Sequence, residues 1–188
     1  MREHVIEIVV DSWEIECCAP PPVVGEQSSW RPVFVPSEDH PLASEHRWTV
    51  VAHDPAPRLH RDGVTAAWGG VRTEPPQPGE HCLHGFLYGA AHLFEDLPPL
   101  AGRVRRIRVI SDEREVDPEN ARALRPVPGS VRTRDVDASP RWFAWPHRQP
   151  NEPAGTASTA GTNLRFAAAA PGPGRYETGV VVDLLVTA

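Results

Sequence analysis

The run from residue 175 to residue 187 alternates between apolar and polar side chains more regularly than any other part of the chain. Strict alternation over this length is typical of a β-strand, because successive side chains of a strand point to opposite faces. Val181 and Leu185 make the second face partly apolar as well, so we expect this strand to lie centrally in a sheet. The residues that share the first face are Tyr176, Thr178, Val180, Val182, Leu184 and Val186.

A second alternating run, from residue 5 to residue 35, predicts the hairpin on which the rest of the sheet is built. Its apolar residues change from even to odd positions after Asp11, which predicts one extra residue there, either a bulge or a tight turn. Three prolines at 20–22 then remove amide donors from the ladder, and the strand pattern resumes at Trp30. The second strand is therefore expected to be short and to lie at a sheet edge.

Residues that interrupt regular structure are frequent, with 22 prolines and 14 glycines among 188 residues. They favour short strands between turns over long helices. We therefore expect an all-β fold with at most one short helix, near residues 117–124. The expected architecture is a small, partly open β-barrel of the SH3-like or a similar type, with long Pro/Gly-rich loops. Further strand-like segments occur at 30–35, 47–53, 64–68, 103–110 and 129–136, and residues 80–94 fit a strand or a short helix.

The length fits a single domain over residues 1–188, because a hydrophobic content of 40% suffices for one core. From about residue 146 to residue 174 the chain consists mainly of proline, alanine, glycine, serine and threonine, with little to bury. Ordering such a segment would not offset its loss of conformational entropy. We therefore expect a flexible insertion at 146–174, before a final strand at 175–187.

Charge is distributed unevenly along the chain. The formal net charge is -6, and the first 60 residues contain four arginines and ten acidic residues. An acidic surface repels nucleic acid and anionic membranes, so neither is an expected partner. No apolar run approaches the length of a spanning helix, and the first residues lack the features of a signal peptide. With three cysteines, too few for a disulfide framework, the sequence predicts a cytoplasmic location.

Two clusters of soft ligands suggest zinc as an alternative. Cys17 and Cys18 form one cluster, and His81, Cys82 and His84 form the other. Thiolate and imidazole groups suit zinc. However, neighbours on a strand point to opposite faces, so the two adjacent cysteines are not expected to reach one ion. The sequence thus favours core packing for the cysteines and no cofactor, with zinc as the alternative.

The search for catalytic motifs finds no nucleophile elbow, phosphate loop, H-E-x-x-H helix or dinucleotide fingerprint. A non-catalytic role is therefore favoured, and no catalytic residue is expected. The alternative is an enzyme centred on His81, Cys82 and His84, because imidazoles titrate near neutral pH and serve in acid–base catalysis. Glu80 is the first acidic partner to consider for these histidines.

A binding surface is the favoured functional feature. Eleven arginines and seven acidic residues lie between residues 103 and 148, and small β-barrels bind single-stranded nucleic acid with basic and aromatic side chains. Outward strand positions ordinarily carry charge, however, so a solvated face explains the arginines better. The candidate binding residues are Trp13, Trp30, Trp142, Trp145, Arg106 and Arg108.

The sequence favours a binding or interaction module for a protein or a small ligand of unknown identity. Tryptophan and arginine dominate the energetics of interfaces, which supports this class. The acidic first 60 residues support another alternative, an immunity-like partner that neutralises a basic protein.

Several short motifs form a pattern of a Trp, Cys-Cys, Val-Gly and Trp series, a His-containing turn and a Gly-x-Val-x-x-Ile strand. This pattern resembles that of a family of small uncharacterised actinobacterial proteins. All 19 basic residues are arginine, which is typical of a GC-rich genome of that type. The resemblance implies a cytoplasmic β domain without an established activity. In this chain the motifs are at 11–18, 24–25, 30, 81–85 and 102–107.

Overall fold

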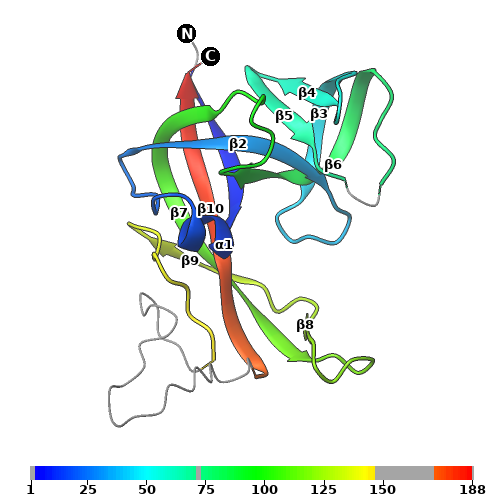
Figure 1. Cartoon of the computed structure of the whole chain (residues 1–188). Coiled ribbons are helices and arrows are strands. Elements are labelled where there is room, and N and C mark those ends of the chain that lie inside the picture. Colours follow the sequence, from blue (N-terminus) through cyan, green and yellow to red (C-terminus); the bar gives the residue numbers. More distant parts are fainter. Residues whose placement is uncertain (1–2, 71–72, 147–171, 188) are drawn as a thin grey trace, which may run out of the picture.

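The computed structural model describes residues 3–70, 73–146 and 172–187. These residues form a mostly β structure with one short helix, which confirms the predicted class (Figure 1). In chain order the elements are β1 (Glu3–Asp11), α1 (Ser12–Cys17), β2 (Gln27–Pro36), β3 (Ser44–Val51), β4 (Arg58–Arg61), β5 (Val64–Trp68), β6 (Gly79–Ala90), β7 (Leu100–Val116), β8 (Leu124–Pro126), β9 (Arg132–Val136) and β10 (Gly174–Thr187).

The strands form one mixed sheet that closes on itself twice. Pairings of β1 with β10, β10 with β7, β7 with β2, β2 with β6 and β6 with β1 connect five strands in a ring. A second ring runs from β6 through β3, β4 and β5 to β2. Strands β2 and β6 belong to both rings, and β8 and β9 extend from β7. An SH3-like barrel topology stays a prediction.

Strand β10 lies centrally, as its sequence predicts. Its residues 179–187 pair with the whole of β1, and its other side pairs with β7. Val180, Val181 and Val182 are all inaccessible to solvent, so both faces of the strand are buried. Gly179 follows a bulge, and a Cβ atom at this glycine would lie 2.2 Å from the carbonyl oxygen of Val10. Close packing of β1 on β10 therefore requires glycine at this position.

One hydrophobic core extends through both rings. The ring of Phe34 lies 5.7 Å from that of Trp48 and 5.9 Å from that of Trp68, measured between centroids. These three side chains belong to the second ring of strands, and the same cluster includes Ile8 and Val182 from the first. The two rings therefore share one core, and a single domain over residues 1–188 stays a prediction.

The predicted N-terminal hairpin is wrong in two respects. Among the described strands β1 does not pair with β2, which lies between β6 and β7 rather than at a sheet edge. The odd-numbered alternation after Asp11 belongs to helix α1, because the Asp11 carboxylate accepts a hydrogen bond from the Trp13 amide at 2.7 Å and caps the helix. Residues 117–124, predicted to form a helical turn, contain no helix: turns and bends lead to Leu124, where β8 begins.

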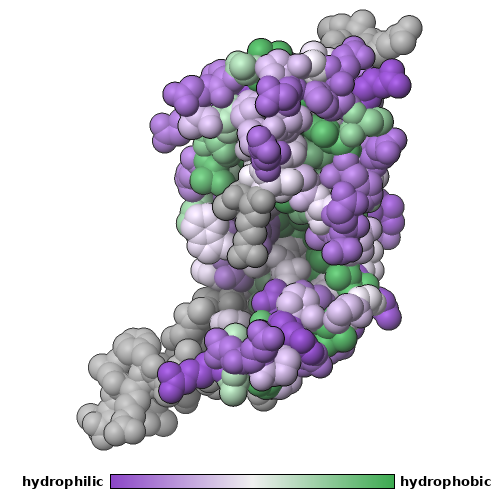
Figure 2. All heavy atoms as spheres, turned by 90° about the vertical axis from the view of Figure 1, so that its right-hand side faces the viewer, coloured by the Kyte–Doolittle hydropathy of each residue, from purple (hydrophilic) through white to green (hydrophobic). Residues whose placement is uncertain are grey.

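The predicted insertion at 146–174 lies almost entirely outside the described residues. Helix α1, the one helix among those described, is too short and too polar to cross a membrane. Figure 2 shows the right-hand side of the molecule, where hydrophilic side chains predominate and hydrophobic ones form small separate patches. The described residues visible on this face therefore form no broad apolar surface for docking.

Candidate functional site

A hollow in the second ring lies along one edge of β3. It has a volume of about 640 Å³, and five consecutive residues of β3, from Glu45 to Thr49, line it. The opposite wall consists of the end of β4, the turn at Asp62 and Gly63, and the start of β5. Consecutive residues of a strand point to alternate faces, so a hollow lined by all five borders the backbone edge of the strand.

This edge of β3 has backbone groups without a neighbouring strand. Residues Ser44–Val50 pair with β6 on one side, whereas β4 pairs only with Thr49–Val51 on the other. Within the described chain no strand pairs with the second side of residues 44–48. The hollow thus occupies the place that β4 would take if it continued beyond Arg61 instead of turning. An extended chain can pair there.

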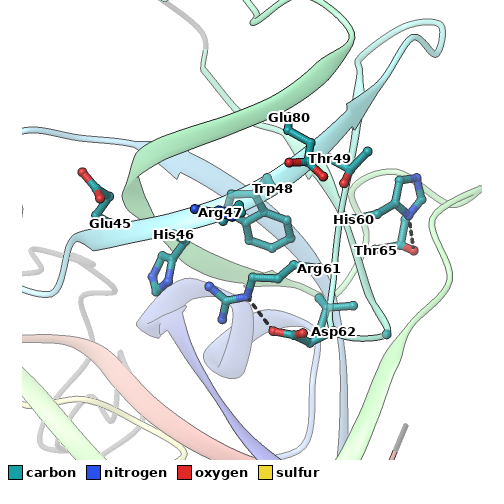
Figure 3. A pocket seen from close by; sticks show the side chains of 12 residues that line it. Glu45, His46, Arg47, Trp48, Thr49, His60, Arg61, Asp62, Thr65 and Glu80 are labelled. Atoms are coloured by element: carbon teal, nitrogen blue, oxygen red, sulfur yellow. Dashed lines mark hydrogen bonds and ion pairs between the residues drawn. The ribbon is translucent and has the colours of Figure 1, made fainter.

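Arg61 and Trp48 form the wall at the centre of the hollow. The guanidinium carbon of Arg61 lies 5.1 Å from the centroid of the Trp48 ring, which gives a cation–π contact (Figure 3). Arg61 Nε lies 3.6 Å from an Asp62 carboxylate oxygen. The indole nitrogen of Trp48 is buried and has no hydrogen-bond partner among the described residues. Trp48 is only 1% exposed, so the donors that a ligand acceptor can reach on this wall are those of Arg61.

His46 lies beside Arg61 on the same wall, as Figure 3 shows. Its Nε2 is 2.7 Å from the hydroxyl oxygen of Ser44. Burial lowers the pKa of His46, Arg61 and His84 lower it further, and Glu7 opposes them. The imidazole is therefore neutral at pH 7, so Arg61 supplies the positive charge of this part of the wall.

A smaller hollow of about 240 Å³ shares His46, Trp48 and Arg61 with the larger one. It lies between β1 and β3, and its remaining wall is mainly apolar, with Leu42 and Phe86. The two hollows together give a site that is polar along the β3 edge and apolar towards β1. Such a combination suits a ligand with both backbone-like polar groups and an apolar side chain.

We expect the protein to lose stability below about pH 6.5, partly through His46. Because the folded-state pKa of His46 is lowered, the unfolded chain binds the proton first as the pH falls. The free energy of unfolding should be unaffected above pH 6.5 and should decrease as the pH passes through the lowered folded-state value. Urea unfolding at several pH values should show a smaller decrease for His46→Gln and for Arg61→Gln. An equal decrease in all three proteins would contradict this assignment.

The four tryptophans predicted to bind a partner differ in burial. Trp30 is buried in the core at 2% exposure, and its indole nitrogen donates to Ser28 Oγ at 2.8 Å. Trp13 on α1 is 58% exposed. Trp142 is half-buried, and Trp145 contacts the ring of Tyr176 edge-on. Burial excludes Trp30 as a surface contact, and binding by the other three tryptophans stays a prediction.

The two predicted binding arginines are engaged by carboxylates of neighbouring strands. Arg106 donates to both carboxylate oxygens of Asp135 at 2.6 and 3.0 Å. Arg108 bonds Glu7 and also donates to Asp183 at 2.8 Å. Hydrogen bonding to Asp135 raises the pKa of Arg106 above its ordinary value. These arginines thus connect strands β1, β7, β9 and β10 across one face of the sheet.

The predicted ligands on β6 lie apart from the cysteine pair. His81 Nε2 donates to the Gln77 carbonyl and His84 Nδ1 to the Ser37 carbonyl, each at 2.7 Å. The exposed Cys82 thiol donates to Glu45 at 3.2 Å, and this hydrogen bond raises the pKa of Cys82. These three side chains are bonded to three different parts of the chain.

Cys17 and Cys18 are joined as a disulfide, and His92 is their neighbour rather than the β6 residues. Core packing of the cysteines was expected, and this is wrong, because Cys17 and Cys82 are exposed and Cys18 is half-buried. The end of a short helix turns the cysteine pair outward, whereas a strand would have buried one of the two. A bond between consecutive residues closes no loop of chain, so it forms no framework.

One dipeptide in the sequence indicates part of the hollow beside β3. The Asp62-Gly63 dipeptide lies between strand-forming residues and has positive φ angles of 48° and 78°. Such a dipeptide is a strong indication of a tight hairpin, which here is formed by β4 and β5. The wall at Arg61 could have been predicted from it. The open edge of β3 could not, because it depends on where β4 leaves its partner.

Comparison with known proteins identifies a family but no activity. No curated protein and no solved structure matches the chain. A family model, described as a family of unknown function (DUF6578), matches residues 4–186 and so covers every described strand except the ends of β1 and β10. The chain therefore belongs to the DUF6578 family, whose function is unknown.

Proposed function

We propose that the protein is a non-catalytic binding module that takes up an extended peptide as an additional strand along the open edge of β3. The observation that carries this proposal is the single-sided pairing of residues 44–48 beside a hollow of about 640 Å³. Backbone amides and carbonyls at such an edge bond readily to another extended chain.

The walls of the hollow supply contacts for peptide side chains. A strand paired with β3 would direct alternate side chains towards the wall formed by Arg61, Trp48 and His46. Arg61, whose guanidinium lies over the buried ring of Trp48, can donate to a carboxylate or a carbonyl of the peptide. Hydrogen bonds of the backbone would give affinity, and this wall would give preference for peptides with an acceptor at the matching position.

The proposal can be tested by selecting peptides from a displayed random library and measuring amide hydrogen exchange with a selected peptide bound. We expect slower exchange of the amides at 44–48, because pairing protects them. Strand β9 is the matched control, since it also pairs on only one side, with β7, among the described strands. Equal protection of both edges, or protection of neither, would refute the proposal.

Arg61→Ala is expected to weaken binding of the selected peptide by about tenfold or more, because a hydrogen bond to a charged group contributes about 1.5–3 kcal/mol. Fluorescence polarisation of the labelled peptide measures the change. Arg105→Ala is the control, since Arg105 is exposed on β7 and does not line the hollow. Similar affinities for both variants would show that Arg61 makes no contact with the peptide.

A cytoplasmic location and an immunity-like role against a basic protein stay predictions from the sequence. The second has less support than peptide binding, because the acidic side chains Glu7 and Asp183 bond Arg108 instead of forming a continuous acidic surface. An enzyme or a zinc protein centred on His81, Cys82 and His84 also has less support than peptide binding. These three side chains are hydrogen-bonded to Gln77, Glu45 and Ser37, in three different parts of the chain.

A further inference from the structure

We infer that reduced Cys17 and Cys18, together with His92, form a binding site for a thiophilic cation, with zinc as the probe. The two cysteine sulfur atoms and one imidazole nitrogen of His92 all lie within 4.8 Å of one another. Among the described residues this is the one group of three or more histidine, cysteine or acidic side chains with ligand atoms so close together. The group has no residue in common with the hollow beside β3.

Helix α1 fixes the two cysteines. The helix ends at Cys17, and the Cys18 amide donates to the Glu14 carbonyl at 3.0 Å. The next amide, that of Ala19, donates to the same carbonyl at 2.9 Å. The backbone on both sides of the sulfur atoms is therefore held in place, and only side-chain rotation is needed to orient the thiolates.

The carboxylate of Glu14 holds the segment that leads to His92. Glu14 is 1% exposed, and its two oxygens accept hydrogen bonds from the Tyr88 hydroxyl and the Ala91 amide, each at 3.0 Å. Arg31 donates to the Ala91 carbonyl at 2.9 Å. One buried residue of α1 thus positions both halves of the cluster, which is an arrangement that free surface residues lack.

The donor set matches the chemistry of zinc and related cations. Zinc takes thiolate and imidazole ligands at about 2.3 and 2.0 Å, so donor atoms around one ion lie within about 4 Å of one another. Small side-chain rotations bring the present atoms into that range. Cys17 and His92 are exposed, so a fourth position is open to water or to another ligand.

Binding requires reduction of the disulfide that the structure contains between Cys17 and Cys18. A dithiol reductant transfers two electrons and two protons to the disulfide and becomes a disulfide itself, which leaves two free thiols on the protein. Zinc then binds the two sulfurs and displaces their two protons. The cluster therefore binds the cation only in its reduced form.

The test uses the full chain, reduced with a dithiol, loaded with zinc under exclusion of oxygen and freed of excess metal. Plasma mass spectrometry should find one zinc per chain, and a chelator competition should show a decrease in affinity of more than about tenfold for His92→Ala, since even outer partners of a metal site contribute that much. Cys17→Ser and Cys18→Ser should lose the metal. Cys82→Ser and His84→Ala are the matched controls and should keep it.

His92 is exposed, so His92→Ala is not expected to affect folding. Cobalt replaces zinc in a second measurement, in which reduced wild-type protein should give sulfur-to-cobalt absorption and oxidised protein should give none. The inference is overturned if fully reduced protein binds no zinc, if His92→Ala binds it as tightly as the wild type, or if Cys82→Ser loses it. The last result would instead assign the metal to β6.

Discussion

Replacing Val182 with aspartate is expected to unfold the protein. Val182 is inaccessible to solvent in the middle of β10, where it pairs with Ile8 on one side and Ile107 on the other. A carboxylate at this position has no cation to bond, and burying an unpaired charge belongs to the mutations that cost more than about 4 kcal/mol. Since domains of this kind are stable by about 5–15 kcal/mol, the variant would keep little or none of that stability.

Circular dichroism and urea unfolding of Val182→Asp measure this effect. The matched control is Val5→Asp, which makes the same substitution on the neighbouring strand β1 at a side chain that is 54% exposed. We expect the control to lose about 1 kcal/mol or less, as is usual for strand positions open to water. Similar unfolding curves for both variants would show that β10 is not the buried centre of the sheet.

Glu14→Ala is expected to have the second-largest effect, a loss of about 3 kcal/mol in the free energy of unfolding. The substitution leaves the Tyr88 hydroxyl and the Ala91 amide without their acceptor, and each unsatisfied buried donor costs about 1–3 kcal/mol. Burial, together with the charge of Glu14, raises the pKa of Tyr88, so this hydroxyl stays protonated and keeps its need for an acceptor.

A double-mutant cycle with Tyr88→Phe separates this bond from general effects of the helix. Tyr88→Phe removes one donor, so the Glu14→Ala substitution should cost less in that background, and the two changes should not be additive. Urea unfolding of the four proteins gives the coupling energy. Additive losses would mean that the Glu14 carboxylate does not act through Tyr88.

The strands that the sequence predicts well are those with one strong local pattern. β7 alternates clearly over residues 100–105 and its burial follows, whereas β10 is buried on both faces at its centre, as its partly apolar second face predicts. Residues 12–17 also alternate in the sequence, but they form helix α1 instead of a strand. Two consecutive residues of this helix, Glu14 and Ile15, are both buried. Burial of Glu14 depends on Tyr88 and Ala91, more than seventy residues further along the chain. No local sequence pattern predicts such a distant partner.

In the candidate site, too, features with a local sequence pattern can be predicted, whereas features that depend on distant residues cannot. Its tight turn at Asp62 and Gly63 has a local signal, whereas the hollow beside β3 results from where two strands separate. Likewise, the basic positions Arg106 and Arg108 are evident in the sequence, but their acidic partners come from other strands. Charge that looks unbalanced in one segment is therefore balanced in the folded sheet.

The place of β10 between β1 and β7 also affects how the chain reaches its native state. During synthesis β1 emerges first of the described strands, and its partner β10 emerges after all the others. Until then β1 and β7 both present open edges, and contacts of such high sequence separation form slowly. Until β10 is synthesised, the open edges of β1 and β7 can associate with other chains. The strand that stabilises the finished sheet therefore also determines how long the nascent chain is open to aggregation.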